Sequence, residues 1–105
     1  MTALVIDTLF IEEDRPEHIA KHNITIDEVV EVLTGDYVFI AGREKCWLII
    51  GKTAKAGFLT IVLGERPKQN TYGLITARPA RRKERSFYRE YKTQGGGEDD
   101  EDDTS

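Results

Sequence analysis

The sequence predicts a single α+β domain: a first strand, two short helices, an antiparallel sheet of about four to five strands and a C-terminal basic helix. Three observations carry this prediction. Helix-capping signals stand in the first third of the chain, short β-rich segments alternate with polar turns in the middle, and a helical period marks the residues after 79. With 105 residues, 39% of them apolar, the chain has room for one core. We place the domain at residues 1–94 and a disordered Gly/acidic tail at residues 95–105.

The first third of the chain carries signals for one strand and two helices. Acidic residues before Pro16 are typical of a helix start, because carboxylates are stabilised at the positive end of the helix dipole. Asn23, which tolerates the left-handed conformation, is expected to end that helix. Thr25 and Glu28 have the spacing of a capping box, and Gly35 is expected to stop the helix behind them. The predicted elements are a strand over 4–11, a helix over 15–22 with Ile19 and Ala20 inward, and a helix over 26–33 that buries Val29, Val30, Val32 and Leu33.

The middle of the chain is expected to form the sheet. The segment from Trp47 to Ile50 is apolar at every position, so its strand should be covered on both faces. We interpret Trp47 as a core residue, because its neighbours are apolar. The connections over 42–45 and 54–57 are short enough for hairpins. The predicted strands are 37–41, 46–53, 58–63 and 72–77.

The last predicted helix is strongly basic. Pro79 suits its first turn, where a missing N–H removes no hydrogen bond. On a helical wheel Ala80, Phe87 and Tyr91 share one face, with Tyr88 at its border. A basic stripe lies within an arc of about 80° away from Phe87, and it consists of Arg81, Arg82, Arg85, Arg89 and Lys92. This stripe is either a solvated helix face or a surface for phosphates, and the preference for arginine, whose fork matches phosphate oxygens, favours phosphates.

Charge is distributed unevenly along the chain. Residues 1–36 carry nine acidic and two basic side chains, whereas residues 78–94 carry seven basic and two acidic ones. The tail after Gly97 adds six carboxylates. The net charge of −4 therefore averages an acidic beginning, a basic C-terminal helix and an acidic tail. This asymmetry favours a nucleic acid or an acidic protein as a partner.

Several classes of protein are not indicated by the sequence. A single cysteine, Cys46, excludes an internal disulfide and a cysteine-rich zinc site. We expect no metal site and no cofactor, because His, Cys, Asp and Glu do not recur at ligand spacing. There is no secretory signal pattern and no apolar run of membrane-spanning length. We therefore expect a cytoplasmic protein with no membrane partner.

Three segments of the chain carry a resemblance: residues 18–33 (HIAKHNITIDEVVEVL), 42–63 (GREKCWLIIGKTAKAGFLTIVL) and 72–90 (YGLITARPARRKERSFYRE). Together they resemble the BrnT family, small toxins of type II toxin–antitoxin pairs with a RelE-like ribonuclease fold. The resemblance covers roughly residues 6–91. Its most specific parts are the Lys21-His22 pair and the segment from Thr76 to Tyr88.

The resemblance implies a metal-independent endoribonuclease whose partners are RNA and a cognate antitoxin, expected to be a ribbon-helix-helix protein through which the toxin could oligomerise. The family's polar positions fall on His22, Arg43, Arg78, Glu84, Arg85 and Tyr88. One departure is Phe58, which follows Gly57 where an arginine is common. If that arginine helps to hold the scissile phosphate, the alternative function is a non-catalytic RNA- or protein-binding module of the same fold.

Metal-free RNA cleavage needs activation of the ribose 2′-OH, stabilisation of the phosphorane charge and protonation of the leaving oxygen. Arg78 and Arg85, with Arg43 as a third, are the candidates for stabilisation. Each candidate proton carrier also has a purely structural interpretation. His22 could be a surface histidine, Glu84 could pair with Arg81, and Tyr88 could pack at the edge of the core. The remaining stripe residues (Arg81, Arg82, Arg89 and Lys92) are expected to bind RNA, unless the acidic tail docks on them.

Overall fold

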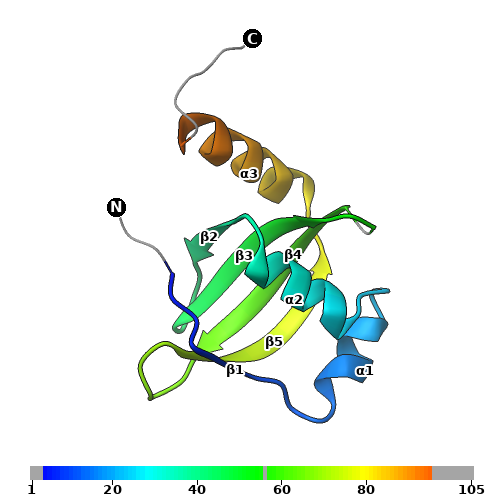
Figure 1. The fold of residues 1–105 in the computed structure, drawn as a ribbon, viewed down its shortest axis with the longest axis vertical. Helices are drawn as coiled ribbons and strands as arrows, with labels where there is room; N and C mark the ends of the chain where they lie inside the picture. Colours follow the sequence, from blue (N-terminus) through cyan, green and yellow to red (C-terminus); the bar gives the residue numbers. More distant parts are fainter. Residues whose placement is uncertain (1–3, 56, 96–105) are drawn as a thin grey trace.

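A computed structural model describes residues 4–55 and 57–95, and it confirms the α+β class (Figure 1). Within these residues one five-stranded sheet is accompanied by three helices. No helix of the described part is long and apolar enough to cross a bilayer. Of the predicted tail, only Gly95 is described, as the last residue of α3; residues 96–105 lie outside. The elements are β1 (Thr8–Phe10), α1 (Arg15–Ala20), α2 (Ile26–Thr34), β2 (Tyr37–Ala41), β3 (Cys46–Thr53), β4 (Gly57–Glu65), β5 (Thr71–Pro79) and α3 (Arg82–Gly95).

The sheet has the strand order β1-β5-β4-β3-β2, and its first pair is parallel. The prediction of a wholly antiparallel sheet is therefore wrong at this edge, although the other three pairs are antiparallel. Successive hairpins dictate antiparallel neighbours, but β1 reaches β5 only after the whole chain between them has folded, so local sequence does not set its direction. β1 is also shorter than predicted, because it pairs with β5 only from Thr71 to Gly73.

Strand β5 runs past its predicted end and includes Pro79, which pairs with Leu59 of β4. The Ala80 N–H then donates to the Phe58 carbonyl oxygen at 3.0 Å, and α3 begins at Arg82. The placement of Pro79 in the first turn of the helix is thus wrong. Proline is tolerated here because β1 covers only the start of β5, which leaves this end at the edge of the sheet.

One face of the sheet is covered by α1 and α2 and forms the larger core. The predicted capping box starts α2, since the Glu28 N–H donates to Thr25 Oγ1 and the Thr25 N–H donates to Glu28 Oε1. Gly51 lets α2 lie close to β3, because a Cβ there would meet Val32 Cγ1 at 2.6 Å. Fully buried residues of this core include Ile19, Val29, Ile49, Leu59, Ile61 and Leu63.

The helices bury less than the sequence suggests. Asn23 has the expected left-handed backbone, with φ of 63°. Ala20 and Val30, however, are exposed, the latter by 45%. Only the side of each short helix that faces the sheet is covered, so apolar residues at the margins of the predicted faces remain in solvent.

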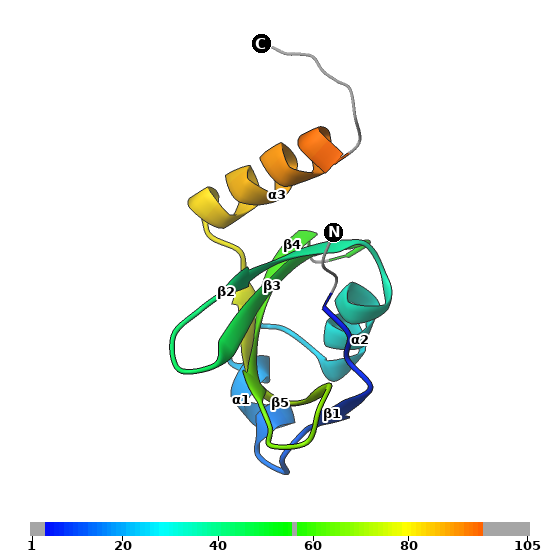
Figure 2. The same ribbon diagram turned by 90° about the vertical axis from the view of Figure 1, so that its left-hand side faces the viewer.

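The other face carries a smaller cluster under α3. Val38, Ile50 and Ala80 are buried there, with Phe58, Phe87 and Tyr88 packed around them. Figures 1 and 2 both place α3 at one end of the molecule and α1 toward the other. Trp47 is only partly buried and lies on the α1–α2 side, where its Nε1–H donates to Glu65 at 2.7 Å. The two apolar surfaces of β3 thus meet different helices, as expected for an inner strand.

Candidate functional site

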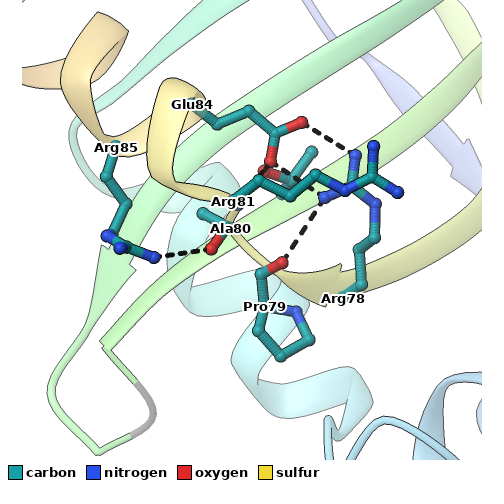
Figure 3. A network of polar contacts seen from close by, with 7 residues as sticks. Arg78, Pro79, Ala80, Arg81, Glu84 and Arg85 are labelled. Atoms are coloured by element: carbon teal, nitrogen blue, oxygen red, sulfur yellow. Dashed lines mark hydrogen bonds and ion pairs between the residues drawn. The ribbon is translucent and has the colours of Figure 1, made fainter.

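The start of α3 is organised around the carboxylate of Glu84, at the third position of the helix. Its Oε1 accepts hydrogen bonds from Thr60 Oγ1 at 2.7 Å, from the Arg81 backbone N–H at 2.7 Å and from Arg78 Nη1 at 2.8 Å. Its Oε2 accepts from Arg78 Nη2, also at 2.8 Å (Figure 3). The contact with the Arg81 N–H is the carboxylate half of a capping box. Four donors from β4, β5 and the helix start therefore converge on one side chain.

This environment fixes the charge of Glu84. The hydrogen-bonded guanidinium of Arg78, opposed by partial burial and helped by the Arg81 N–H and the Thr60 hydroxyl, lowers the pKa of Glu84 to about 2. A carboxylate with so low a pKa is a poor proton acceptor near neutral pH. The expectation that Glu84 pairs with Arg81 is wrong in its partner, because the ion pair is made with Arg78 and Arg81 contributes its backbone instead. Glu84 thus holds the Arg78 side chain in place.

Arg78 is held end-on and keeps one edge of its guanidinium available. Its two terminal nitrogens bind Glu84, and Nη1 also approaches the Pro79 carbonyl oxygen at 3.4 Å. Among the described residues, its Nε–H makes no hydrogen bond. The edge formed by Nε–H and the second Nη2 hydrogen can therefore still make a bidentate contact with an anion. The Arg78 side chain is 19% exposed. The arginine that carries this edge is therefore largely buried, and Glu84 holds it in place.

Arg81 and Arg85 lie on opposite sides of the connection between β5 and α3. Figure 3 shows the side chains of Arg78 and Arg81 extending to the same side and Arg85 to the other. Arg85 Nη1 donates to the Ala80 carbonyl oxygen at 2.9 Å, which ties it back to this connection. Arg81 is exposed. The cation that accompanies Arg78 is therefore Arg81, and Arg85 faces a different part of the surface.

The Tyr88 side chain packs against Phe58. The two rings lie edge to face, with centroids 5.1 Å apart, and both side chains are partly buried. Within the described residues, the Tyr88 hydroxyl makes no hydrogen bond to an arginine. The structural interpretation, a tyrosine at the edge of the smaller core, is the one that its contacts match.

Two predicted residues lie away from the Arg78–Glu84 pair. Arg43 is exposed in the β2–β3 turn, beyond Cys46. Cys46 is four residues along β3 from Ile50, which sits in register with Thr60, so it lies about 13 Å away along the sheet. His22 is exposed and lines an open hollow with Asn23, Ile24, Glu28, Lys55, Leu59 and Pro79. This hollow reaches Pro79 but not Arg78.

The basic stripe is less open than the helical wheel suggests. Arg82 is exposed, but the Arg89 guanidinium lies 5.7 Å from the centroid of the Phe58 ring. Lys92 forms an ion pair with Asp36 at 2.7 Å. Arg81 precedes the helix and is not on the stripe. The side chains of Arg89 and Lys92 therefore lie against other elements, Arg89 near Phe58 of β4 and Lys92 near Asp36, which precedes β2.

Sequence reasoning missed Thr60 and Lys52. Thr60 is fully buried yet donates to Glu84, and Lys52 approaches the Phe58 ring at 5.8 Å. A threonine within the apolar run of a strand is the signal that could have identified the first. Within residues 4–55 and 57–95, no three His, Cys, Asp or Glu side chains gather as a metal site would require. Comparisons of the chain with protein-family models, curated proteins and solved structures each found no match.

Proposed function

We propose that this protein is a BrnT-type, RelE-like toxin of a type II toxin–antitoxin pair that binds RNA where β5 joins α3 and cleaves it without a metal. The observation that carries the proposal is the end-on Arg78–Glu84 pair. Among the described residues it leaves the Nε–H edge of the guanidinium without a hydrogen bond, and Arg81 extends to the same side. A fixed guanidinium edge beside a second cation suits a phosphodiester, because both can bind its non-bridging oxygens.

The roles of the residues follow from their contacts. Arg78 stabilises charge as the phosphorane forms, since preorganised donors need no rearrangement during the reaction. Glu84 and Thr60 hold Arg78 in place, and Arg81 and Arg85 attract the RNA backbone. Tyr88 and His22 remain the candidates for proton transfer, and both would have to approach an RNA bound at Arg78.

The proposal is tested by incubating 5′-labelled RNA with the purified protein, with and without EDTA. We expect cleavage that survives EDTA and leaves 2′,3′-cyclic phosphate ends. Arg78→Ala should lower the rate about a hundredfold or more, in line with the loss of one preorganised charge-stabilising group. Arg43→Ala is the matched control and should stay near the wild-type rate, because Arg43 lies at the other end of β3. Cleavage that stops with EDTA, or equal rates for both variants, would contradict the proposal.

A second candidate function is binding without turnover. The observation that favours it is the combination of an ionised Glu84 and a Tyr88 ring packed against Phe58, which places neither of these two residues as a proton carrier beside Arg78. In the same experiment this candidate predicts RNA binding that weakens with salt and that Arg78→Ala reduces, with no cleavage at any enzyme concentration.

The partner and location form part of the same proposal. The resemblance implies a cytoplasmic complex with a small ribbon-helix-helix antitoxin. Co-expression with the protein from the neighbouring reading frame should give a complex that stays together during gel filtration. If the neighbouring frame encodes no such protein, this part of the proposal falls while RNA binding at Arg78 remains testable.

A further inference from the structure

A histidine of α1, His18, reaches the strand that carries Arg78. Its Nε2 lies 3.1 Å from Thr76 Oγ1 of β5, a hydrogen-bond distance between the two side chains. β1 pairs only with the first residues of β5, so the edge of β5 after them is open to α1. Arg15 of α1 donates to the Ile75 carbonyl oxygen at this edge. His18 therefore approaches β5 from the side that β1 leaves open.

Thr76 and Arg78 lie on the same face of β5. Thr76 is in register with Val62 of β4, and Arg78 is in register with Thr60. Side chains two residues apart leave a strand on one face, about 7 Å from each other. Thr60 donates to Glu84, so this is the face of the Arg78–Glu84 pair. The imidazole that meets Thr76 is therefore the neighbour of this pair along the strand.

The second histidine of this region, His22, is placed differently. Its ring centroid is 6.4 Å from that of His18, but the hollow that it lines includes Leu59 and Pro79. Leu59 belongs to the larger core and pairs with Pro79. Pro79 follows Arg78 in the strand and therefore faces the other way. Of the two histidines, His18 is the one whose contact lies on the face of Arg78.

The contact between His18 and Thr76 is not needed to fasten α1, because Arg15 already binds the edge of β5 through a backbone carbonyl. His18 is half-buried and lines an open hollow on α1, so its ring is accessible from solvent. A neutral imidazole has one ring nitrogen that accepts a hydrogen bond, and histidine is the commonest general base in enzymes. Metal-free RNA cleavage needs such a group near the cation that stabilises the phosphorane.

We propose that His18 is the general base of the cleavage at Arg78. Its Nε2 accepts the proton of the ribose 2′-OH, in the place that the Thr76 hydroxyl has in the structure, while the 2′-oxygen forms a bond to phosphorus. The bond from phosphorus to the 5′-oxygen breaks, water supplies the proton that the leaving oxygen takes, and His18 returns its own proton to solvent. This inference rests on the proposed function, to which it adds a residue that touches the substrate.

The test is His18→Gln, because the glutamine amide can keep a hydrogen bond to Thr76 but cannot act as a base at neutral pH. We expect His18→Gln and His18→Ala each to lower the single-turnover cleavage rate about a hundredfold, and to bind a non-cleavable 2′-O-methyl RNA within about twofold of wild type. An RNA ester with a p-nitrophenolate leaving group needs no protonation of the leaving oxygen, so it should show the same loss. Glu17→Gln changes an exposed neighbour on the same helix. It is the matched control and should cleave at close to the wild-type rate.

Two results would overturn the inference. Wild-type cleavage by His18→Gln would mean that His18 only fastens α1, and recovery of the rate on the p-nitrophenyl ester would assign His18 to the leaving oxygen. In both cases loss of cleavage in Arg78→Ala would leave the proposed function standing. If the wild type cleaves no RNA, the inference fails together with the proposed cleavage. Urea titrations followed by circular dichroism should give His18→Gln the same midpoint as wild type, which separates the loss of a base from a loss of folding.

Discussion

The two faces of the sheet are made by the same strands but are covered in different ways. Among the described residues, the face under α1 and α2 carries a cluster of eleven buried residues that are all apolar or aromatic. The face under α3 has three such residues, and beside them stand Thr60, Arg78 and Glu84. Burial of apolar area supplies most of the stability of a small domain. The first face can therefore carry the fold, which leaves the second face free to hold charges.

Neighbouring residues on β3 allow a direct comparison of the two faces. Ile49 and Ile50 are both fully buried, and they point to opposite sides of the sheet. Ile49 lies under two helices and the surrounding strands. Ile50 lies in the smaller cluster, to which α3 contributes Phe87 and Tyr88. A cavity under α3 can partly close by movement of the helix, whereas a cavity in the larger core cannot.

The largest expected effect is therefore a difference between two identical truncations. Ile49→Ala should lower the free energy of unfolding by about 4 kcal/mol and Ile50→Ala by about 2 kcal/mol, both within the range of about 2–5 kcal/mol for such changes. Urea titrations followed by circular dichroism measure both. Equal losses would mean that α3 is as firmly packed as α2 and that the two faces contribute alike.

The sequence predicts the first face better than the second. Its elements are marked by local signals, such as the capping box at Thr25 and Glu28, that the structure confirms. The second face depends on non-local facts. Pro79 belongs to a strand because β4 pairs with it, and the partner of Glu84 is Arg78 because the connection after Pro79 brings the two together. A helical wheel uses only the order of residues within one helix, so it predicts neither the strand pairing of Pro79 nor the Arg78–Glu84 pair.

The candidate site shows the same limit. The sequence predicts Arg78, Glu84 and Arg85 as a group only through the resemblance that the segment from Thr76 to Tyr88 carries. It does not separate their roles, since these depend on the direction in which each side chain leaves the backbone. Arg78 and Arg85 extend to opposite sides of the connection (Figure 3). The sequence predicts Arg43 as a third such arginine, but the hairpin register places it at the far end of β3.

The second prediction concerns Glu84, whose ion pair with Arg78 lies on the second face, under α3. Its folded-state pKa of about 2 lies below the ordinary value of 4.5, so its contribution is complete above about pH 4.5 and is lost as the pH falls toward 2. One pKa unit corresponds to about 1.4 kcal/mol. Allowing for the partial exposure of the pair, we expect Glu84→Gln to cost about 2–3 kcal/mol at pH 7. The difference between wild type and variant should shrink steadily below pH 4.5.

Glu90→Gln is the matched control, because it changes a carboxylate on an exposed part of the same helix. Its effect should stay within about 0.5 kcal/mol, as for most surface substitutions. Urea titrations between pH 2.5 and pH 7 compare the three proteins. A gap between wild type and Glu84→Gln that does not change with pH would show that the Arg78–Glu84 pair is not the source of the loss.

The smallest expected effect concerns the other end of α3. Lys92 reaches Asp36, at the junction of α2 and β2, with an ion pair of 2.7 Å in which the aspartate side chain is 84% exposed. Exposed pairs of this kind contribute about 0–1 kcal/mol and are weakened by salt. Lys92→Ala should thus change the free energy of unfolding by less than about 0.5 kcal/mol, and 0.5 M salt should remove most of that difference. Hydrogen exchange of the last described turns of α3 should nevertheless be faster in the variant, because a weak contact fixes the end of a helix locally. If exchange there is unchanged, the packing of Phe87 and Tyr88 alone holds α3 against the second face, and the contrast between the two faces is smaller than the geometry indicates.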